Sequence, residues 1–504
     1  MIRPMRSHPQ YLEFFQTRRA ELQVKVPHNA TELWCKFRHT DLSAVYALCA
    51  PLYDAQYGRP AFRPDDMLRS WLLMLECHVT SVEVWVHRLH EQPVYALLSG
   101  FDPEAIPGVG TFYAFQDRLL QLHRSPVNQA CRPHRRDAQR QGDPALRDKH
   151  DTAPHSGILN RLAERLTARF STPAPYGQWS INLAALPVEQ RILKAVFYLV
   201  FVSTSVAHGL LDLHDLHVAG DGTHLPTWAN PRGHKLCSCD NRHKPRAQHC
   251  DCLRRYHDPL ASWGWDSYRE CYVYGHGLYE LTAYSLKHDC QLPLVITLLD
   301  NHRHDSVAYL AAMHEAVDLL GLPIATASLD KAHDNLALYR LGAEHWHLHS
   351  VIPLNQRHAG HFTYEPPCAL SPDGTPLCAA GQPMVYWGYC PDRQRLKWRC
   401  PLKTQRTPEP EPACACSPSR YGRVVYTYPA ENYRLFSPLR RGSPLWALHA
   451  DRRSCAERSI KRKKLDFGLE QTRLAGRVRW FFRVMLAAMC QHLDAWQHHA
   501  RLVG

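Results

Sequence analysis

Apolar residues at helical spacing mark the beginning of the chain. Between residues 64 and 75 the large apolar side chains recur every three or four positions, which places them on one face of an α-helix. The same spacing returns after residues 80–83, whose sequence is typical of a helix cap, and after the turn at residues 107–111. Short helices joined by tight turns are found in helix-turn-helix DNA-binding units and in ordinary helical bundles. We predict a helical N-terminal domain over residues 1–125.

The pattern changes after residue 125. The next stretch carries many cations among Pro, Gln, Asp and His and almost no large apolar side chains, a composition typical of a linker. It is either a solvated tether between two domains or a basic strap that lies on phosphates. We predict a basic linker over residues 126–186.

Strand and helix patterns alternate over residues 187–349. Runs rich in β-branched and aromatic residues predict strands, and apolar residues at helical spacing between a cap and a glycine predict helices. A mixture of this kind indicates an α/β domain with a mixed sheet, interrupted by a Cys/His insertion at residues 232–260. The predicted strands are 216–223, 272–285, 292–299 and 325–330, and the predicted helices are 187–211, 305–320 (with Asp305 as its N-cap) and 332–341.

The chain becomes rich in Pro, Gly and Cys over residues 350–447, with short aromatic pieces such as residues 383–389. This composition predicts a β-rich, Cys-containing insertion. Helical spacing then returns, most clearly over residues 473–499. We expect residues 448–504 to form C-terminal helices that complete the second domain.

Composition and charge narrow the class of protein. Hydrophobic residues make up 45% of the chain, which excludes wholesale disorder. The most apolar run, residues 192–206, is shorter than the ~18 residues of a membrane span and carries polar side chains, and the N-terminus has no signal-peptide pattern. We therefore expect a cytoplasmic protein with no membrane partner. The net charge of +13 favours nucleic acid as the partner, although a basic enzyme without such a partner has the same charge.

Three acids stand out as candidate functional groups. Two predicted strands end in Asp221 and Asp330, and acids at adjacent strand ends converge on one spot, where cations must offset their charge. Glu457 is a single acid in a dense cationic helix, with Arg453 and Lys464 on the same helical face. That face would carry a metal-binding carboxylate between two phosphate-binding cations. The structural alternatives are a turn or cap for each aspartate and a weak ion pair for the glutamate.

The three acids and their neighbours resemble the catalytic blocks of bacterial insertion-sequence DDE transposases. The third block is similar to the Y-x2-R-x3-E-x6-K signature of one large branch, and the second to its D-x-A-[YH]-D pattern. Residues 63–119 resemble the helical N-terminal domain of these enzymes, so the resemblance covers most of the chain in order. The blocks are Asp221-Gly222-Thr223, Leu329-Asp330-Lys331-Ala332-His333-Asp334 and Arg453-x3-Glu457-x6-Lys464.

The resemblance implies an RNase H-like catalytic domain preceded by a helical DNA-binding domain. It implies that Asp221, Asp330 and Glu457 hold two Mg²⁺ or Mn²⁺ ions, which cleave and rejoin DNA by phosphoryl transfer. The substrates would be the terminal inverted repeats of an insertion sequence and a target duplex, bound by a homodimer associated with the nucleoid. Asp334 is an alternative ligand, with Asp266 as a further candidate. The DNA-binding cations would be Arg453, Arg458, Lys461 and Lys464.

Two positions depart from the family pattern. The signature tyrosine falls at Ala450, and His333 stands where tyrosine is common. These departures leave a second hypothesis, a catalytically decayed transposase that still binds a specific DNA sequence without cutting it. A zinc hydrolase is a third hypothesis, but the chain lacks the compact H-E-x-x-H motif.

The eighteen cysteines predict reduced thiols or metal ligands rather than disulfides, because the chain is long and has no signal peptide. Two C-x-C units ten residues apart could hold a structural zinc ion in a segment with no apolar core. A looser second set could form another zinc site. The first set is Cys237, Cys239, Cys250 and Cys252; the second is Cys378, Cys390, Cys400, Cys414 and Cys416.

Overall fold

The computed structural model describes residues 2–54, 58, 60–122, 131–132, 158–169, 183–240, 243, 254–286, 290–355, 368–404 and 417–503. Its first part consists of short helices. They are α1 (His8–Glu21), α2 (His28–Phe37), α3 (Ser43–Cys49), α4 (Pro64–Glu76), α5 (Val82–Glu91), α6 (Pro93–Ser99) and α7 (Val109–Leu119). The predicted helices of this region are present, and Ser81 caps α5 by accepting a hydrogen bond from the Val84 backbone.

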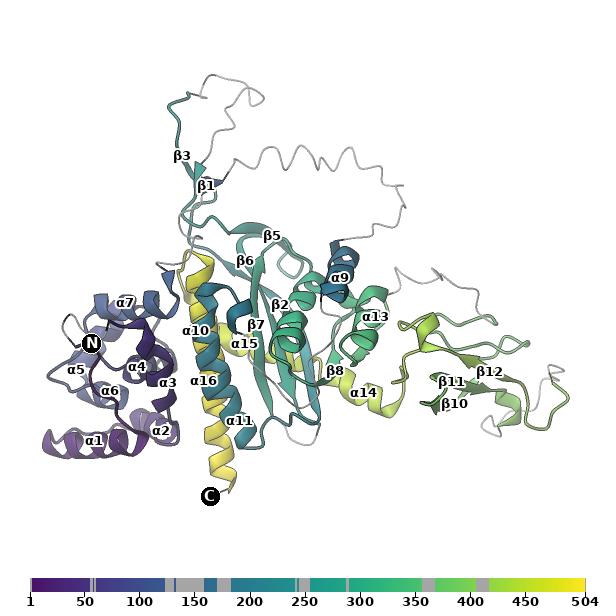
Figure 1. The fold of residues 1–504 in the computed structure, drawn as a ribbon, viewed down its shortest axis with the longest axis horizontal. Helices are drawn as coiled ribbons and strands as arrows, with labels where there is room; N and C mark the ends of the chain where they lie inside the picture. The colour runs from purple at the N-terminus through teal and green to yellow at the C-terminus, as the bar shows by residue number, and fades with distance from the viewer. Residues whose placement is uncertain are drawn as a thin grey trace.

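A mixed sheet forms the centre of the molecule (Figure 1). The long strand β6 lies between β7 on one edge and β2 on the other, both antiparallel to it, and β8 and β9 follow on the far side of β2, both parallel to β2. Strand β5 pairs with β6 beyond the end of β7. The strands are β2 (Leu216–Pro226), β5 (Ser262–Asp266), β6 (Cys271–Tyr284), β7 (Gln291–Asp300), β8 (Ile324–Ser328) and β9 (His349–Val351).

Two sequence-based boundaries in this sheet were wrong. Strand β2 does not end near Asp221 but pairs with β6 as far as Pro226, so that Asp221 lies in the middle of the strand. The helix expected from residue 332 begins later, as α13 (Leu336–Glu344). The reason is local capping: Asp330 accepts the Ala332 backbone N–H in a short 3-10 turn, and Asn335 then caps α13.

Helices cover both faces of the sheet. The Cα of Gly222 faces α12 (Asp305–Met313), because a Cβ there would lie 2.4 Å from a carboxylate oxygen of Asp305. Glu280, the β6 residue opposite Asp221, faces the other way and bonds to α15 (Ser454–Leu465). Since neighbouring strand residues point to opposite faces, Asp221 lies on the α15 face.

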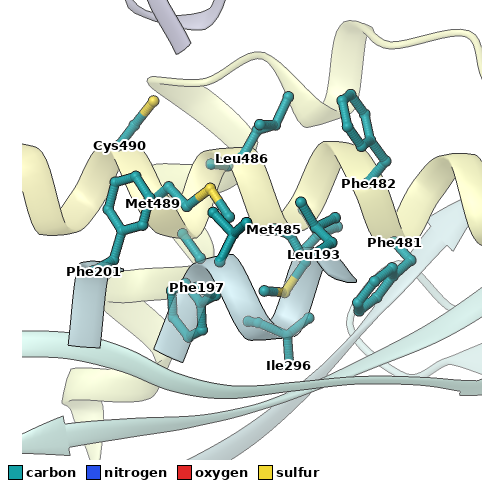
Figure 2. Close-up of a cluster of buried hydrophobic side chains, with 14 of the residues drawn as sticks. Leu193, Phe197, Phe201, Ile296, Phe481, Phe482, Met485, Leu486, Met489 and Cys490 are labelled. Atoms are coloured by element: carbon teal, nitrogen blue, oxygen red, sulfur yellow. The ribbon is translucent and has the colours of Figure 1, made fainter. Parts of the chain in front are cut away.

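The C-terminal helix α16 (Arg477–Val503) joins the sheet to the N-terminal helices. Figure 2 shows its apolar side chains, such as Phe481 and Met485, packed against Leu193 and Phe197 with Ile296 of β7 beneath. On another side of α16, Trp71 of α4 contacts Phe482 edge to face. The hydrophobic core is therefore continuous from the first helices to the sheet.

The segment Val188–Ala207, which contains α10 (Val188–Val196) and α11 (Ser203–Ala207), is apolar for a structural reason. Among the described residues it is the one helix long and apolar enough to cross a membrane, with mean hydropathy 1.3. However, 56% of its most apolar window is buried inside the structure, where Phe197 and Phe201 pack against α16. A core helix has the same composition as a membrane span, so this segment is weak evidence for a membrane protein.

Two of the segments predicted to lie outside the main domains contain regular structure. Within the predicted linker, α9 (Ile158–Arg169) packs against α12 and α13, with Leu159 and Ala163 buried; its apolar residues follow helical spacing, which the basic composition of the segment concealed. The predicted β-rich insertion contains an antiparallel sheet of β10 (Val385–Cys390), β11 (Arg395–Arg399) and β12 (Val424–Thr427). Helix α14 (Pro444–Asp451) then leads back to α15.

Candidate active site

A cleft of about 1190 Å³ lies at the edge of the central sheet. It is bordered by the middle of β2, the turn between β5 and β6, the end of β7, the start of α12, the loop after β8 and one face of α15. The three acids predicted from the sequence, Asp221, Asp330 and Glu457, all line this cleft, together with Asp305.

Asp221 is the most perturbed acid of the cleft. Burial raises its pKa to about 7, and the nearby carboxylates of Asp305 and Glu457 add to the rise. The cause is physical: a carboxylate loses hydration when it is buried, and like charges disfavour its ionised form. The site therefore disfavours a negative charge on Asp221 unless a cation offsets it.

Asp305 is a cleft residue that the sequence interpretation missed. We expected it to cap α12, but the N-cap is His304, whose side chain accepts the Ser306 backbone N–H, and Asp305 is the first helical residue. Burial raises the pKa of Asp305, while the charge of His333 acts against this rise. An acid at the start of a helix is common for local reasons, so no pattern in the sequence distinguished Asp305 as a cleft residue.

Asp330 follows β8 and is held by a buried chain of hydrogen bonds. The His333 Nδ1–H donates to Asp330 at 2.5 Å, and His333 Nε2 forms a hydrogen bond with the Tyr279 hydroxyl at 2.9 Å. Burial acts to raise the pKa of Asp330, but the hydrogen bond and charge of His333 outweigh it and bring the pKa below its usual value. Asp330 is thus ionised and oriented, whereas Asp221 is not stabilised as an anion.

Glu457 projects from α15 toward the cleft and forms an ion pair with Arg453, one helical turn earlier. Lys461 and Lys464 line the cleft beside it. Arg458 does not: its guanidinium donates to Gln291 at 3.0 Å, at the start of β7. The described geometry therefore brings two of the four predicted DNA-binding cations into the cleft and uses Arg453 as the partner of Glu457.

A buried polar network fixes α15 on the sheet behind Glu457. Lys463 and Glu280 are both fully buried, with Lys463 Nζ 2.8 Å from a carboxylate oxygen of Glu280. Ser459 donates to the same carboxylate, and Gln491 of α16 accepts from Lys463. Because Glu280 pairs with Asp221 across β2 and β6, this network sets the position of Glu457 relative to Asp221.

The two alternative acids have other partners. Asp334 is buried outside the cleft lining, where Arg434 donates to both of its oxygens at 2.7 and 2.8 Å and the Asn355 backbone N–H adds a third bond. Asp266 lies at the rim of the cleft and accepts the backbone N–H groups of Tyr268 and Arg269. Asp334 is therefore a packing residue, which favours Asp330 over Asp334 as the cleft acid.

The cleft acids suit a hard divalent cation in chemical type, because carboxylate oxygens are preferred ligands of Mg²⁺ and Mn²⁺. The high pKa of Asp221 agrees with a site that takes up positive charge. Across the described parts of the chain, however, no group of three or more His, Cys, Asp or Glu side chains is arranged to hold a metal ion. A cation would have to draw these side chains together.

The predicted zinc sites are described only in part. Cys237 and Cys239 are half-buried in the segment after β3 (His234–Lys235), whereas Cys250 and Cys252 lie outside the described residues. Of the second set, Cys378, Cys390 and Cys400 are described, and Cys414 and Cys416 are not.

Compared with models of protein families, with curated proteins and with solved structures, the chain gives no significant match.

Proposed function

We propose that the chain is a DDE transposase that cleaves and rejoins DNA at the ends of an insertion sequence with Mg²⁺ or Mn²⁺. The observation that carries the proposal is that Asp221, Asp330 and Glu457, which are far apart in the sequence, line one cleft. Elements of three kinds supply them: the middle of a strand, the end of a parallel neighbour and a helix packed on the sheet.

The order of the strands supports an RNase H-like fold for this domain. Three antiparallel strands run from β7 through β6 to β2, and two parallel strands, β8 and β9, continue the sheet after a helical crossover. In this arrangement the first acid comes from β2 and the second from the loop after β8. We infer an RNase H-like catalytic domain preceded by helices that bind DNA.

Each group of the cleft has a role in this function. When bound by Asp221, Asp330 and Glu457, divalent cations would activate water or a 3′-hydroxyl and stabilise the leaving oxygen. Tyr279 and His333 orient Asp330. Lys461 and Lys464 supply positive charge for the phosphates of the strand.

The partners and location follow from the same proposal. The substrate is double-stranded DNA, at first the terminal inverted repeats and then a target, bound by a homodimer in the cytoplasm at the nucleoid. The excess positive charge of +13 supports a polyanionic partner. A structural zinc ion held by the two C-x-C units remains part of the proposal.

A second candidate function is a decayed transposase that only binds a specific DNA sequence. Two observations favour it: Ala450 stands at the position of the signature tyrosine, and Arg453 already neutralises Glu457. In this alternative the cleft keeps its shape and its DNA affinity but does not organise metal ions.

One experiment separates the two candidates. Purified full-length protein is mixed with a labelled duplex that carries the inverted repeats flanking the coding region, with Mg²⁺, Mn²⁺ or a chelator, beside a gel shift. An active enzyme cuts one defined phosphodiester bond with either metal and not with the chelator. Binding without cutting under every condition would contradict the enzyme and support the decayed binder, and a duplex that is neither bound nor cut would contradict both.

A further inference from the structure

The hairpin of β5 and β6 carries a row of four aromatic side chains, three of which are exposed. Trp263 and Trp265 lie on one face of β5, and Tyr274 and Tyr272 lie directly opposite them on β6. We call these four residues the aromatic ladder. The exposed fractions of Trp263, Trp265 and Tyr272 are 47%, 52% and 66%. Such exposure of neighbouring large aromatic rings in a chain with an extensive core marks a binding surface.

The aromatic ladder is ordered as two cross-strand pairs. Trp265 and Tyr272 meet edge to face with ring centroids 4.9 Å apart, and Trp263 and Tyr274 are tilted at 5.2 Å. Gly264, between the tryptophans, cannot carry a side chain, because a Cβ there would lie 2.2 Å from the Asn301 carbonyl oxygen. This face of the hairpin therefore packs closely on Asn301, just after β7, and the ladder lies on the other face.

The ladder is continuous with the candidate active site. Strand β6 pairs with β2 without a shift from Gly275 to Leu281, so the alternation of side chains places Tyr272 and Tyr274 on the same face as Glu280, the face toward Asp221 and α15. Trp265 itself lines the cleft. A chain that runs through the cleft can pass onto the ladder without crossing the sheet.

Charged groups beside the ladder fit a phosphate backbone. Lys461, Lys464 and Arg269 line the cleft together with Trp265 and the 95% exposed Tyr268, and Arg269 is also ion-paired with Glu470 at 3.2 Å. Cations that follow a backbone, combined with aromatic faces on which bases stack, are the combination that binds single-stranded nucleic acid without sequence preference. The polar turn of residues 267–270 beside the ladder is unlike the charge-depleted centre of a protein–protein interface.

We propose that the aromatic ladder of the β5–β6 hairpin stacks unpaired bases of a DNA strand that passes through the cleft. The inference rests on the proposed function, and it adds a substrate feature: the enzyme holds a single-stranded stretch next to the phosphodiester bond that it cuts. A competing occupant of an exposed aromatic face is a second copy of this chain.

The test uses full-length protein in a chelator, so that binding is separated from cleavage. Fluorescence anisotropy measures the affinity for a labelled oligothymidylate and for an abasic oligonucleotide of the same length, which keeps the phosphates and lacks the bases. The variant is Trp263→Ala with Trp265→Ala. Trp265→Phe preserves a stacking ring, and Trp387→Ala removes a tryptophan that is 43% exposed on the distant strand β10.

Wild-type protein is expected to bind the oligothymidylate roughly tenfold or more tightly than the abasic strand. The double alanine variant is expected to bind both strands with the abasic affinity, while Trp265→Phe and Trp387→Ala keep the preference for bases. A wild type without this preference, or a double variant that retains it, would overturn the proposal. The proposal would also be overturned if the double variant bound both strands like the wild type but sedimented differently in ultracentrifugation. The ladder would then be a contact between two copies of the chain.

The failure of this inference can be told apart from failure of the proposed function. If the ladder variant keeps the wild-type preference for bases while wild-type protein still cuts the inverted repeats, only the ladder assignment is wrong. If wild-type protein binds bases through the ladder but never cuts, the stacking surface stands and the enzymatic function is contradicted.

Discussion

At the residue scale, Asp221 shows what the cleft does to a carboxylate. An aspartate in an unfolded chain has a pKa of about 3.9, and burial beside other acids raises that of Asp221 to about 7 in the folded protein. The folded state therefore binds the proton more tightly. The protonated Asp221 side chain therefore adds to the free energy of unfolding below pH ~4, and this contribution is lost as the pH rises through about 7.

Asp221→Asn removes this pH-dependent loss of stability. In a chelator at pH 8 the variant is expected to melt roughly 2–5 °C above the wild type, and the difference should shrink toward zero near pH 4. Thermal unfolding followed by circular dichroism across this range measures it. Asp266→Asn is the matched control: its pKa is lowered, despite burial, by hydrogen bonds from the Arg269 and Tyr268 backbone, so this change should not stabilise the protein at pH 8. If the difference in melting temperature between Asp221→Asn and the wild type were the same at every pH, the account would be contradicted.

Three of the four acids discussed above as cleft residues could be predicted from the sequence. Asp221, Asp330 and Glu457 could be named from the sequence because each stands in a short recognisable block. Asp305 could not, because an acid at the start of a helix is common for local reasons, and its place in the cleft depends on a tertiary contact with Gly222. The Tyr279–His333–Asp330 chain likewise joins residues from separate elements.

At the element scale, the position of α15 depends on a buried ion pair. Lys463 and Glu280 are enclosed between α15, β6 and α16. Removing one partner of such a pair leaves an uncompensated buried charge, which costs about 3–5 kcal/mol of unfolding free energy.

Lys463→Met is therefore expected to lower the free energy of unfolding by about 3–5 kcal/mol. The double variant Lys463→Met with Glu280→Gln should lose clearly less, because no buried charge is left alone. Denaturant unfolding of the metal-free protein measures both. The exposed neighbour Lys461→Met is the control and should change stability by less than about 0.5 kcal/mol. A double variant less stable than Lys463→Met would contradict this description of the network.

The two C-x-C units make a separate prediction for their segment. Protein purified without chelators should carry about one zinc ion per chain. Replacing Cys237 and Cys239 by Ser should lower both the zinc content and the melting temperature, whereas Cys271→Ser, an exposed thiol on β6, should change neither. Elemental analysis and thermal unfolding provide the measurements, and zinc-free wild-type protein of the same stability would reject the site.

Elements were predictable where their pattern was long. The apolar runs of β6, β7 and α16 are long enough that no single residue changes which element they predict. Strand β9 is three residues long, too short for a periodic signal, and β5 alternates Trp with Gly, so that half of its pattern is missing. The start of α13 was misplaced because the side chains of Asp330 and Asn335 cap different turns.

At the scale of the whole molecule, the pairing order of the sheet could not be derived from the chain. Strands β2 and β8 are parallel neighbours although about a hundred residues separate them, so no local pattern in the sequence indicates that they pair. The continuous core also joins the N-terminal helices to α16.

The proposed DNA binding, together with the positive charge of the molecule, predicts a response to salt. The logarithm of the affinity falls linearly with the logarithm of the salt concentration, and each phosphate contact makes this slope steeper by about 0.9. The double variant Lys461→Ala with Lys464→Ala should therefore reduce the slope for an inverted-repeat duplex by about 2. Arg393→Ala, an exposed cation in the turn between β10 and β11, is the control. An unchanged slope in the lysine variant would place those cations off the DNA.

The central claim is that three distant acids act as one metal-binding unit, and a double-mutant comparison of cleavage rates tests it most directly. Asp221→Asn and Glu457→Gln are expected to lower Mg²⁺-dependent cleavage of the inverted-repeat duplex by roughly a thousandfold or more each, without weakening DNA binding. The double variant should be no slower than the worse single variant by more than a few-fold, since a unit can be lost only once. The account would be contradicted if the rate loss of the double variant equalled the product of the two single losses. A single variant that cuts at the wild-type rate would also contradict it.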